Sequence, residues 1–383
     1  MERKIALLTA SDLSKVQGST ETKYVADFLA ENYDTHIYSR FDPEMANVTY
    51  HEISNPSVIP ALLLYNVILL PYFFFQNHKH DFDLFYTYRG FHLTPFVISQ
   101  LNDCDWIADF RTKPTGQAKE QASLSNTDGI ITSLYYKLQD ILYELTLPHA
   151  KAIITLSEPI RADLQESYDV DPARIQLVPL GVDSDKFSPE RAQDGYTEPL
   201  DIVYMGSIAS KRGIDMCIRS LASEELELEV QLHLIGDGPD EDIHSLREIA
   251  RKSDCQDRIK WHGYVDHNSI PEILNKMDVA ISPLPAHDAY EVSSPAKIFE
   301  YLSMGLPIIC SNIRAHTHLL TEGETCFFFE PGSQTSFISA INRIEQSDSA
   351  TWQTMCEEAR YEGTRHDWSN RMKSIQSTIE QNS

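Results

Sequence analysis

The chain has 383 residues, with 32 lysines and arginines against 57 aspartates and glutamates, so its net charge is −25. This charge argues against nucleic acid as a partner, because phosphate backbones are bound through lysine and arginine. It also disfavours, without excluding, docking on an anionic membrane. The length is that of two domains with separate cores, and the 42% hydrophobic and 10% aromatic content indicates a globular protein.

The start of the chain and its cysteines bear on the cellular compartment. The segment from Met1 to Asp12 leads directly into a strand pattern, so we expect no signal peptide. The six cysteines are scattered without Cys-X-X-Cys spacing, which favours a reducing compartment and supplies no metal site. We therefore expect a cytoplasmic protein.

One apolar run, Ile59–Phe75, is near the minimum length of a membrane span. It contains Asn66 and two prolines, Pro60 and Pro71, which interrupt it. Three interpretations remain open: a helix packed within the first domain, a contact with the membrane surface, or a true span. The second would place the protein at the inner face of the membrane.

Strand-like runs alternate with helical stretches throughout the chain, which predicts parallel sheets covered by helices on both faces. We therefore expect an α/β protein of two Rossmann-like domains facing each other across a cleft, with ligands at the carboxyl ends of the strands. The expected strands of the first domain are Lys4–Leu8, Thr35–Tyr38, Leu84–Thr87, Trp106–Ala108 and Ala152–Thr155. Those of the second domain are Ile202–Tyr204, Gln231–Ile235, Ile259–Trp261, Val279–Ile281, Pro307–Cys310 and Cys326–Phe329. A polar, turn-rich segment at 189–198 marks the boundary, so the predicted parts are residues 1–187, residues 188–360 and a closing helix within 361–383.

Two segments of the first domain are candidates for its ligand-binding edge. Gly18 lies in a loop before a helical pattern over Glu21–Asn32, and a plain loop is the alternative. Asp109 and Arg111 follow the strand Trp106–Ala108, and a structural ion pair is the alternative there.

In the second domain, a glycine turn follows the first strand. Gly206 and Ser207 lead to Lys211, Arg212 and a second glycine before a helix. Cations in such a turn can neutralise a diphosphate, which is the main electrostatic task when a sugar leaves a nucleotide. A solvated basic turn is the alternative interpretation.

The segment 293–311 holds the most informative pattern, a short helix between a polar loop and a buried strand. Ser294 is in position to cap this helix, Pro295 is expected at its first position, and Gly305 can adopt the left-handed conformation that ends it. An apolar stripe at helical spacing is expected to face the core: Ile298, Phe299 and Leu302.

Lys297 and Glu300 are three residues apart and so share another face of this helix. A helix N-terminus with a lysine in its first turn is suited to a phosphate. A carboxylate one turn further on is suited to the two hydroxyls of a ribose. Together they describe a nucleotide site, and the alternative is an ordinary surface pair between Lys297 and Glu300.

This segment resembles the nucleotide-sugar signature of retaining glycosyltransferases with the GT-B fold, of the group-1 or family-4 type. The form Pro-X-Lys-X-X-Glu-Tyr-X-X-X-Gly-X-Pro is present as Pro295, Lys297, Glu300, Tyr301, Gly305 and Pro307. Five further segments resemble those of the family in the same order: Leu177–Pro189, Asp201–Leu221, Leu232–Asp240, Trp261–Val265 and Arg365–Met372. The resemblance covers most of the chain and implies the GT-B arrangement of the two domains.

The resemblance also implies roles for the candidate residues. Glu300 would bind the ribose, and the backbone near Val265 would meet the base. In the first domain, the loop of Gly18 would approach the diphosphate and the acceptor, while Asp109 and Arg111 would lie near the reacting centre. The diphosphate would be bound by the helix tip and the glycine turn, which comprise Ser294, Pro295, Ala296, Lys297, Gly206, Ser207, Lys211 and Arg212.

The glycine turn departs from the family's pattern. The family usually has an arginine right after the first glycine and a lysine before the second, and this chain has Ser207 and Arg212 there. One cation is therefore lost, or its work has passed to Lys211 or Lys297.

A second departure concerns the donor sugar. The family's commonest form has a glutamate eight residues before the one that binds ribose, and this chain has Val292 there. Glu291 is one residue away and would reach the same place through a longer loop. The contact with the sugar is therefore in doubt.

We expect neither a metal nor a cofactor, the nucleotide sugar being a co-substrate. The two Asp-X-Asp matches, at 81–83 and 103–105, precede strands instead of following them. The fourteen histidines show no metal-ligand spacing. Four of them are interpreted as solvated or core residues: His78, His80, His262 and His267.

The expected activity is metal-independent hexosyl transfer from a nucleotide diphosphate sugar, with uridine slightly favoured over guanosine. The acceptor would be a hydroxyl of a glycan, a lipid-linked saccharide or a small molecule, in polysaccharide or glycoconjugate biosynthesis. Two alternatives remain. One is a nucleotide-sugar epimerase or hydrolase, and the other is a degenerate subunit for binding or scaffolding, to which Ser207 and Val292 point.

Overall fold

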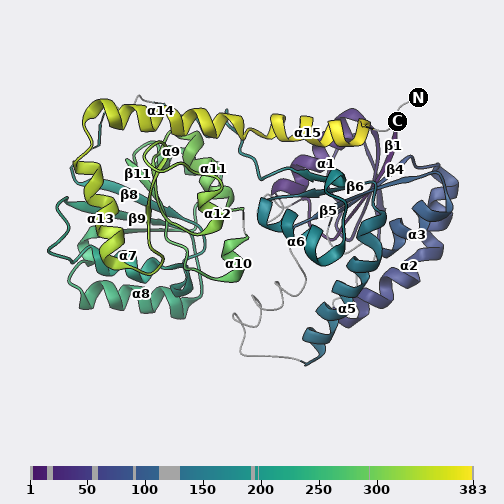
Figure 1. The fold of residues 1–383 in the computed structure, drawn as a ribbon, viewed down its shortest axis with the longest axis horizontal. Helices are drawn as coiled ribbons and strands as arrows, with labels where there is room; N and C mark the ends of the chain where they lie inside the picture. Colours follow the sequence, from purple (N-terminus) through teal and green to yellow (C-terminus); the bar gives the residue numbers. More distant parts are fainter. Residues whose placement is uncertain are drawn as a thin grey trace. The chain divides into compact units, whose positions relative to one another are not determined.

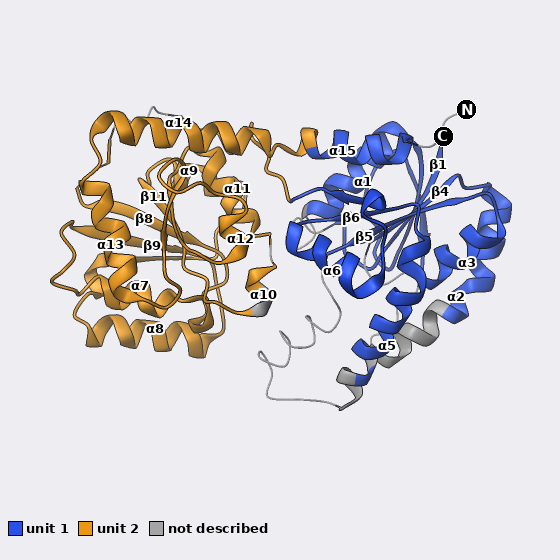
Figure 2. Ribbon diagram, viewed as in Figure 1, with its two compact units in different colours: residues 1–179, 371–383 blue, residues 180–370 orange. Residues whose placement is uncertain are grey.

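The computed structural model describes residues 3–14, 20–53, 59–88, 92–111, 130–190, 195–196, 198–292 and 294–381 (Figure 1). The chain divides into two compact units, residues 1–179 with 371–383 and residues 180–370 (Figure 2). The sequence places the same divisions at 187 and 361. The segment after 179 groups with the second unit because it is bonded there: Val182 N donates to His366 O at 3.0 Å, and Ser184 N to Asp367 Oδ2 at 3.0 Å.

The first unit contains a seven-stranded sheet in the order β3-β2-β1-β4-β5-β6-β7, with all its pairs parallel. Its strands are β1 (Lys4–Thr9), β2 (Asp34–Ser39), β3 (Val48–Glu52), β4 (Leu84–Tyr88), β5 (Asp105–Phe110), β6 (Ala152–Thr155) and β7 (Ile175–Leu177). The five predicted strands are confirmed. The two edge strands, β3 and β7, were not predicted, because β3 is only partly buried and β7 is three residues long.

Helices lie between most of the consecutive strands of this sheet, as parallel pairing requires. They are α1 (Thr20–Asn32), α2 (Ile59–His80), α3 (Leu93–Leu101), α5 (Ile130–Thr146) and α6 (Glu158–Tyr168), with α15 (Trp368–Glu380) at the end of the chain. Short 3-10 turns are η1 (Leu147–His149) and η2 (Pro172–Arg174). Helices α2, α3 and α5 pack against one another on one side of the sheet (Figure 1). The end of α15 joins the first unit, where Arg3 donates a hydrogen bond to the carbonyl of Ile379.

The apolar run at Ile59–Phe75 lies in α2, a helix that contains Pro71. Leu69 and Phe73 on this helix are buried, whereas Ile68 and Phe75 are each 63% exposed. Among the helices of the described residues, none combines the length and apolarity that crossing a membrane requires. The packed-helix interpretation is therefore confirmed for the buried face, and a contact of the exposed face with a membrane surface stays a prediction.

The second unit contains a six-stranded parallel sheet in the order β10-β9-β8-β11-β12-β13. All six predicted strands are confirmed as β8 (Leu200–Met205), β9 (Val230–Ile235), β10 (Ile259–Gly263), β11 (Val279–Ser282), β12 (Ile308–Ser311) and β13 (Cys326–Phe329). In both units the strand order reverses once, between β1 and β4 and between β8 and β11. These are the switch points at which Rossmann-like sheets bind ligands, at the carboxyl ends of the strands.

The helices of the second unit enclose its sheet in two apolar layers. They are α7 (Ile214–Ser220), α8 (Asp240–Lys252), α9 (Ile270–Leu274), α10 (Asp288–Glu291), α11 (Ala296–Ser303), α12 (Arg314–Thr317), α13 (Gln334–Glu345) and α14 (Ser349–Arg365), with the 3-10 turns η3 (Ser210–Arg212) and η4 (Gln256–Arg258). The predicted stripe of α11 is confirmed, since Ile298, Phe299 and Leu302 are all buried.

Helix α14 lies in close contact with α11 at Gly363. A Cβ atom at Gly363 would lie 2.3 Å from the backbone nitrogen of Ser303, closer than two such atoms can approach. Arg360, one turn earlier on α14, donates hydrogen bonds to the carbonyls of Ser303 and Phe187. Glycine at 363 therefore fixes the position of α11 against α14.

We predict that Gly363→Ala destabilises the protein by about 1–3 kcal/mol in urea unfolding, because the added methyl group forces the two helices apart. Helix propensity alone would give the opposite sign, a gain of about 1 kcal/mol. Gly195→Ala is the matched control, since a Cβ atom at Gly195 meets nothing within 4 Å. Equal stabilities of the two variants would contradict the close contact.

Candidate functional site

Two glycine loops of the second unit pack backbone to backbone at the carboxyl ends of β8 and β9. Gly206 N donates to Ile235 O at 2.9 Å, and Ile208 N donates to Asp237 O at 2.9 Å. A Cβ atom at Gly236 would lie 1.9 Å from Gly206 O, so the approach requires glycine. The sequence Gly236-Asp237-Gly238-Pro239 thus supports the neighbouring loop, in agreement with its being too short for a dinucleotide fingerprint.

The cations of the turn after β8 differ in their surroundings. Lys211 is exposed. Arg212 is half-buried, with its Cζ 5.0 Å from the ring centroid of Tyr290. Gly213 follows with φ +77°, and a Cβ atom there would lie 2.1 Å from the carbonyl oxygen of Pro283 at the end of β11. The turn after β8 is therefore packed against the end of β11, on the other side of the switch point. Arg212 lies against Tyr290, whereas Lys211 is exposed to solvent.

Helix α11 begins one residue later than predicted. It starts at Ala296 with Pro295 as N-cap, and no side chain caps it. The expected cap by Ser294 is wrong: its hydroxyl is buried and has no hydrogen-bond partner among the described residues. The predicted end is confirmed, since Gly305 has φ +69° and Leu306 N donates to Tyr301 O at 3.0 Å.

Lys297, in the first turn of α11, lies over the ring of Tyr204. Its Nζ is 4.0 Å from the ring centroid, and it is also 4.0 Å from the position a Cβ atom would take at Gly206. Burial, and to a smaller extent the nearby Arg212, lower the pKa of Lys297 to about 7, while Cys217 and Glu300 oppose this shift. Within the described parts of the chain, neither cationic side chain forms a hydrogen bond or an ion pair.

Glu300 does not pair with Lys297 as the surface-pair alternative requires. Its Oε1 lies 2.7 Å from Nε2 of His267, and Nδ1 of His267 lies 2.8 Å from Nζ of Lys186. Both His267 and Lys186 were missed as site residues. The signal for His267 was its position two residues after Val265, in the loop already predicted to meet the base.

Val265 follows β10 and is half-buried, with its side chain against the second unit's core. The carbonyl oxygen of Gly263, two residues earlier, accepts a hydrogen bond from Gly236 N at 2.8 Å. The loop is thereby joined to the glycine frame, and its backbone lies at the carboxyl edge. The contact of this backbone with the base stays a prediction.

Two further residues beside α11 hold the loops of β11 and β12. Oε2 of Glu291 accepts a hydrogen bond from Arg314 N at 2.7 Å. His316 is fully buried, with Nε2 3.0 Å from Ser282 Oγ and Nδ1 2.7 Å from Ser311 O. Burial lowers the pKa of His316 to about 4, so it is neutral at pH 7. Glu291 thus organises the segment that begins α12.

Of the candidates in the first unit, Gly18 lies outside the described residues. Asp109 and Arg111 are found together at the carboxyl end of β5, where Arg111 also pairs with Glu21 at the start of α1. Tyr86 Oη donates to Asp109 Oδ2 at 3.0 Å, and Tyr88 Oη donates to Glu21 Oε2 at 3.1 Å. Burial lowers the pKa of Arg111 to about 9. Asp109 is 1% exposed, which favours the structural ion pair over contact with a substrate.

The structure therefore brings together most of the predicted residues of the second unit. Glycine loops, the cations Arg212 and Lys297, the unpartnered hydroxyl of Ser294 and the carboxylate of Glu300 all lie at or beside one sheet edge. Ser207 and Lys211 are exposed on the same turn. Chemically, this edge offers two unpaired cations for an anion and one carboxylate for hydroxyl groups.

Comparison with known proteins shows which family and fold the chain resembles. The family model "Glycosyltransferase Family 4" matches residues 20–186, and "Glycosyl transferases group 1" matches residues 199–347. The lipopolysaccharide glucosyltransferase WaaG of Escherichia coli K12 is 23% identical over 205 residues, which is 50% of this chain and 52% of WaaG. A glycogen synthase of Mycobacterium tuberculosis H37Rv is 25% identical over 194 residues, covering 50% of this chain and 45% of the synthase. The chain thus spans about half the length of the curated relatives it matches.

Solved structures show the same fold over the whole chain. Sucrose-phosphate synthase from Thermosynechococcus elongatus superposes with a TM-score of 0.74 at 18% identity, covering 99% of this chain and 98% of the other. HepE from Anabaena, in complex with UDP, gives 0.72 at 15% identity, with coverages of 99% and 100%. The GT-B class, with two Rossmann-like domains, is confirmed. With two family models that together match most of its length, the chain belongs to the group-1, family-4 glycosyltransferases.

Proposed function

We propose that this protein transfers a sugar from a nucleotide diphosphate sugar to a hydroxyl group of a glycan, a lipid-linked saccharide or a small acceptor. The observation that carries the proposal is the pair of cations without an anion, Lys297 and Arg212. Holding a lysine where burial lowers its pKa to about 7 disfavours the charged form unless an anion binds there. A diphosphate supplies that anion.

The nucleotide would extend from this point along the sheet edge. The diphosphate would lie between the N-terminus of α11 and the turn after β8, with the buried hydroxyl of Ser294 as a further donor. The ribose would bind to Glu300, whose carboxylate His267 already orients at 2.7 Å. The base would meet the backbone near Val265. Uridine is favoured because HepE, of similar fold, was crystallised with UDP.

The proposed reaction proceeds with retention and needs no metal. The bond from the anomeric carbon to the diphosphate oxygen breaks, and the acceptor oxygen forms its bond on the same face. The acceptor proton passes to the β-phosphate oxygen, so no protein base is assigned. Lys297 and Arg212 stabilise the charge that develops on the leaving group, and their fixed positions make this stabilisation effective.

In this proposal the pair Asp109–Arg111 acts through another group, and Glu291 acts both through another group and directly. Glu291 would position the segment after β12 near the sugar through its bond to Arg314 N. Asp109 and Arg111 would hold the start of α1 through Glu21 on the acceptor unit. A sugar contact by Glu291 remains part of the proposal, made by its other oxygen.

A panel of nucleotide sugars, with and without candidate acceptors, separates the proposed activity from its alternatives. Transfer predicts release of nucleoside diphosphate that depends on an acceptor. Release without an acceptor indicates a hydrolase, an isomerised donor indicates an epimerase, and binding without turnover indicates a scaffolding subunit. Unchanged turnover in Glu300→Ala would contradict the assigned ribose contact.

We predict that Lys297→Met lowers kcat/KM for nucleoside diphosphate release by about 10²–10³-fold, the effect of removing one preorganised charge from a developing anion. Lys211→Met, at the exposed position of the turn after β8, is the matched control and should change kcat/KM by less than about threefold, as for a solvated charge. Equal losses of kcat/KM in the two variants would contradict the special role assigned to Lys297.

We also predict that Lys297→Met stabilises the ligand-free protein below pH 7. The folded pKa of about 7 lies below the unfolded value of 10.5, so the unfolded state binds more protons between these values. The loss of folding stability caused by the buried charge of Lys297 is therefore complete below pH 7 and disappears as the pH rises toward 10.5. We expect a gain of at least about 1 kcal/mol in urea unfolding at pH 6, since one pKa unit corresponds to about 1.4 kcal/mol.

This stability difference should shrink between pH 7 and pH 10. Lys211→Met again serves as the control and should show no such dependence, because its side chain is exposed. A difference between Lys297→Met and the original protein that is independent of pH would refute the assigned burial of the ammonium group.

A further inference from the structure

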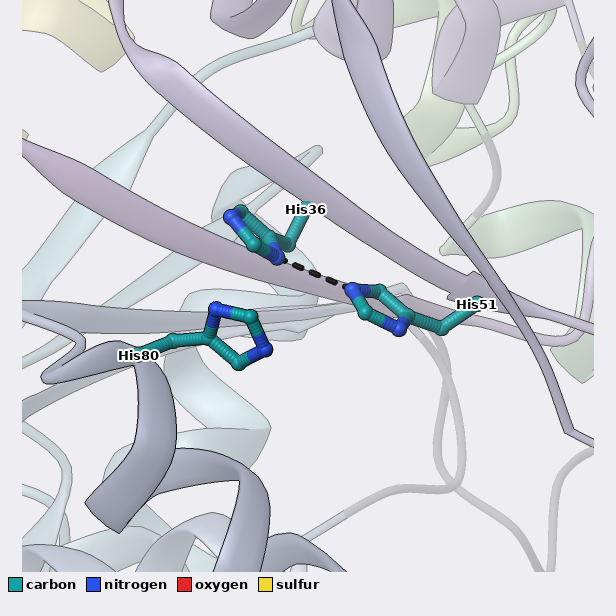
Figure 3. A group of neighbouring side chains, drawn as sticks. All are labelled: His36, His51 and His80. Carbon is teal, nitrogen blue, oxygen red and sulfur yellow. Dashed lines mark hydrogen bonds between the residues drawn. The ribbon is translucent and has the colours of Figure 1, made fainter.

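Three histidines that are distant in the sequence converge in the first unit, on the face covered by α2 (Figure 3). His36 lies on β2, His51 on β3, and His80 is the last residue of α2. One ring nitrogen from each lies within 4.8 Å of the other two. Among the described residues this is the one such group of three histidine, cysteine or acidic side chains.

The fold dictates this convergence. In the register of β2 and β3, Tyr38 pairs with His51 and His36 pairs with Thr49. His36 and His51 are therefore diagonal neighbours on one face of the sheet, with Nδ1 and Nε2 2.9 Å apart. A tetrahedral ion with Zn–N bonds near 2.0–2.1 Å holds its ligand nitrogens about 3.3 Å apart. Small movements of the three rings thus reach that geometry.

The rings are in the chemical state that a metal needs. Burial lowers the pKa of all three histidines, to about 4 for His51, so that they are neutral at pH 7. Nε2 of His80 is buried without a hydrogen-bond partner in the described part of the chain. The carboxylate of Asp34 lies 3.7 Å from Nε2 of His36, on the side away from His51, where ligating histidines commonly have an acidic partner.

A second histidine pair shows what a purely structural arrangement looks like. On β9 and β10 of the second unit, Nδ1 of His233 lies 3.1 Å from Nε2 of His262, and Nε2 of His233 lies 2.8 Å from Asp201 Oδ1. Both nitrogens of His233 are thereby bonded without a third imidazole. In the first unit, by contrast, Nε2 of His80 is buried beside the other two rings without a hydrogen-bond partner among the described residues.

We propose that His36, His51 and His80 bind one divalent transition-metal ion of the zinc class, with water in the fourth position. The ion would join the edge strand β3 and its neighbour β2 to the end of α2. His80 precedes the amino end of β4 in the chain, whereas Asp109 and Arg111 lie at the carboxyl end of β5. The site is therefore distinct from the proposed transfer site, and its role would be structural.

The test uses the full chain without an affinity tag, stripped of metal and titrated with Co²⁺ and then with Zn²⁺. We expect one equivalent of Co²⁺ with the visible absorption of a tetrahedral nitrogen site, displaced by Zn²⁺. His51→Gln and His80→Gln should each weaken binding by about tenfold or more, since each removes one of three ligands. Zn²⁺ should raise the melting temperature of the original protein and not that of these variants.

Two matched controls locate the site. His78→Gln removes an exposed histidine two residues from His80, and His262→Gln breaks the pair in the second unit. Both should bind one equivalent with unchanged affinity. Binding below one equivalent, an unchanged affinity in His51→Gln, or binding that is lost in His78→Gln would overturn the proposal. Circular dichroism of each metal-free variant shows whether it folds.

Discussion

The ammonium group of Lys297 is held over the ring of Tyr204 with a second cation, Arg212, nearby, and among the described residues no carboxylate forms an ion pair with either side chain. A solvated lysine would avoid this position, because burial favours its neutral form. The position persists because α11 is fixed on three sides, by its apolar stripe, by the left-handed end at Gly305 and by the contact with α14 at Gly363. The packing of α11 thus holds Lys297 in a position that is unfavourable for its charged form, and an anionic ligand would stabilise that form.

The backbone makes this arrangement possible. At the carboxyl ends of β8 and β9 the loops approach so closely that a Cβ atom at Gly236 or Gly238 would overlap a carbonyl oxygen of the neighbouring loop. Gly213 makes a similar approach to Pro283 across the switch point. These backbone contacts fix the position of the turn that carries Arg212 relative to α11. The site is therefore built mainly from main-chain geometry, and few side chains are needed to give it chemical character.

Features encoded by neighbours in sequence could be predicted, and features that depend on tertiary contacts could not. Apolar runs identified all six strands of the second unit, and Gly305 identified the end of α11. The cap by Ser294 was wrong because the helix starts later, with Pro295 as its N-cap, and the hydroxyl of Ser294 forms no cap hydrogen bond. His267 was missed because its meaning depends on Glu300, 33 residues away. The convergence of His36, His51 and His80 depends on strand register and on where α2 ends, which no local spacing shows.

The central claim is that a diphosphate binds to Lys297 and stabilises its charged form. Isothermal titration of nucleoside diphosphate at about pH 8, in buffers of different ionisation enthalpy, tests it directly. Because the free lysine has a pKa of about 7 and the bound one would be raised, binding should take up close to one proton per site. An observed enthalpy that does not depend on the buffer, with binding retained in Lys297→Met, would contradict the account.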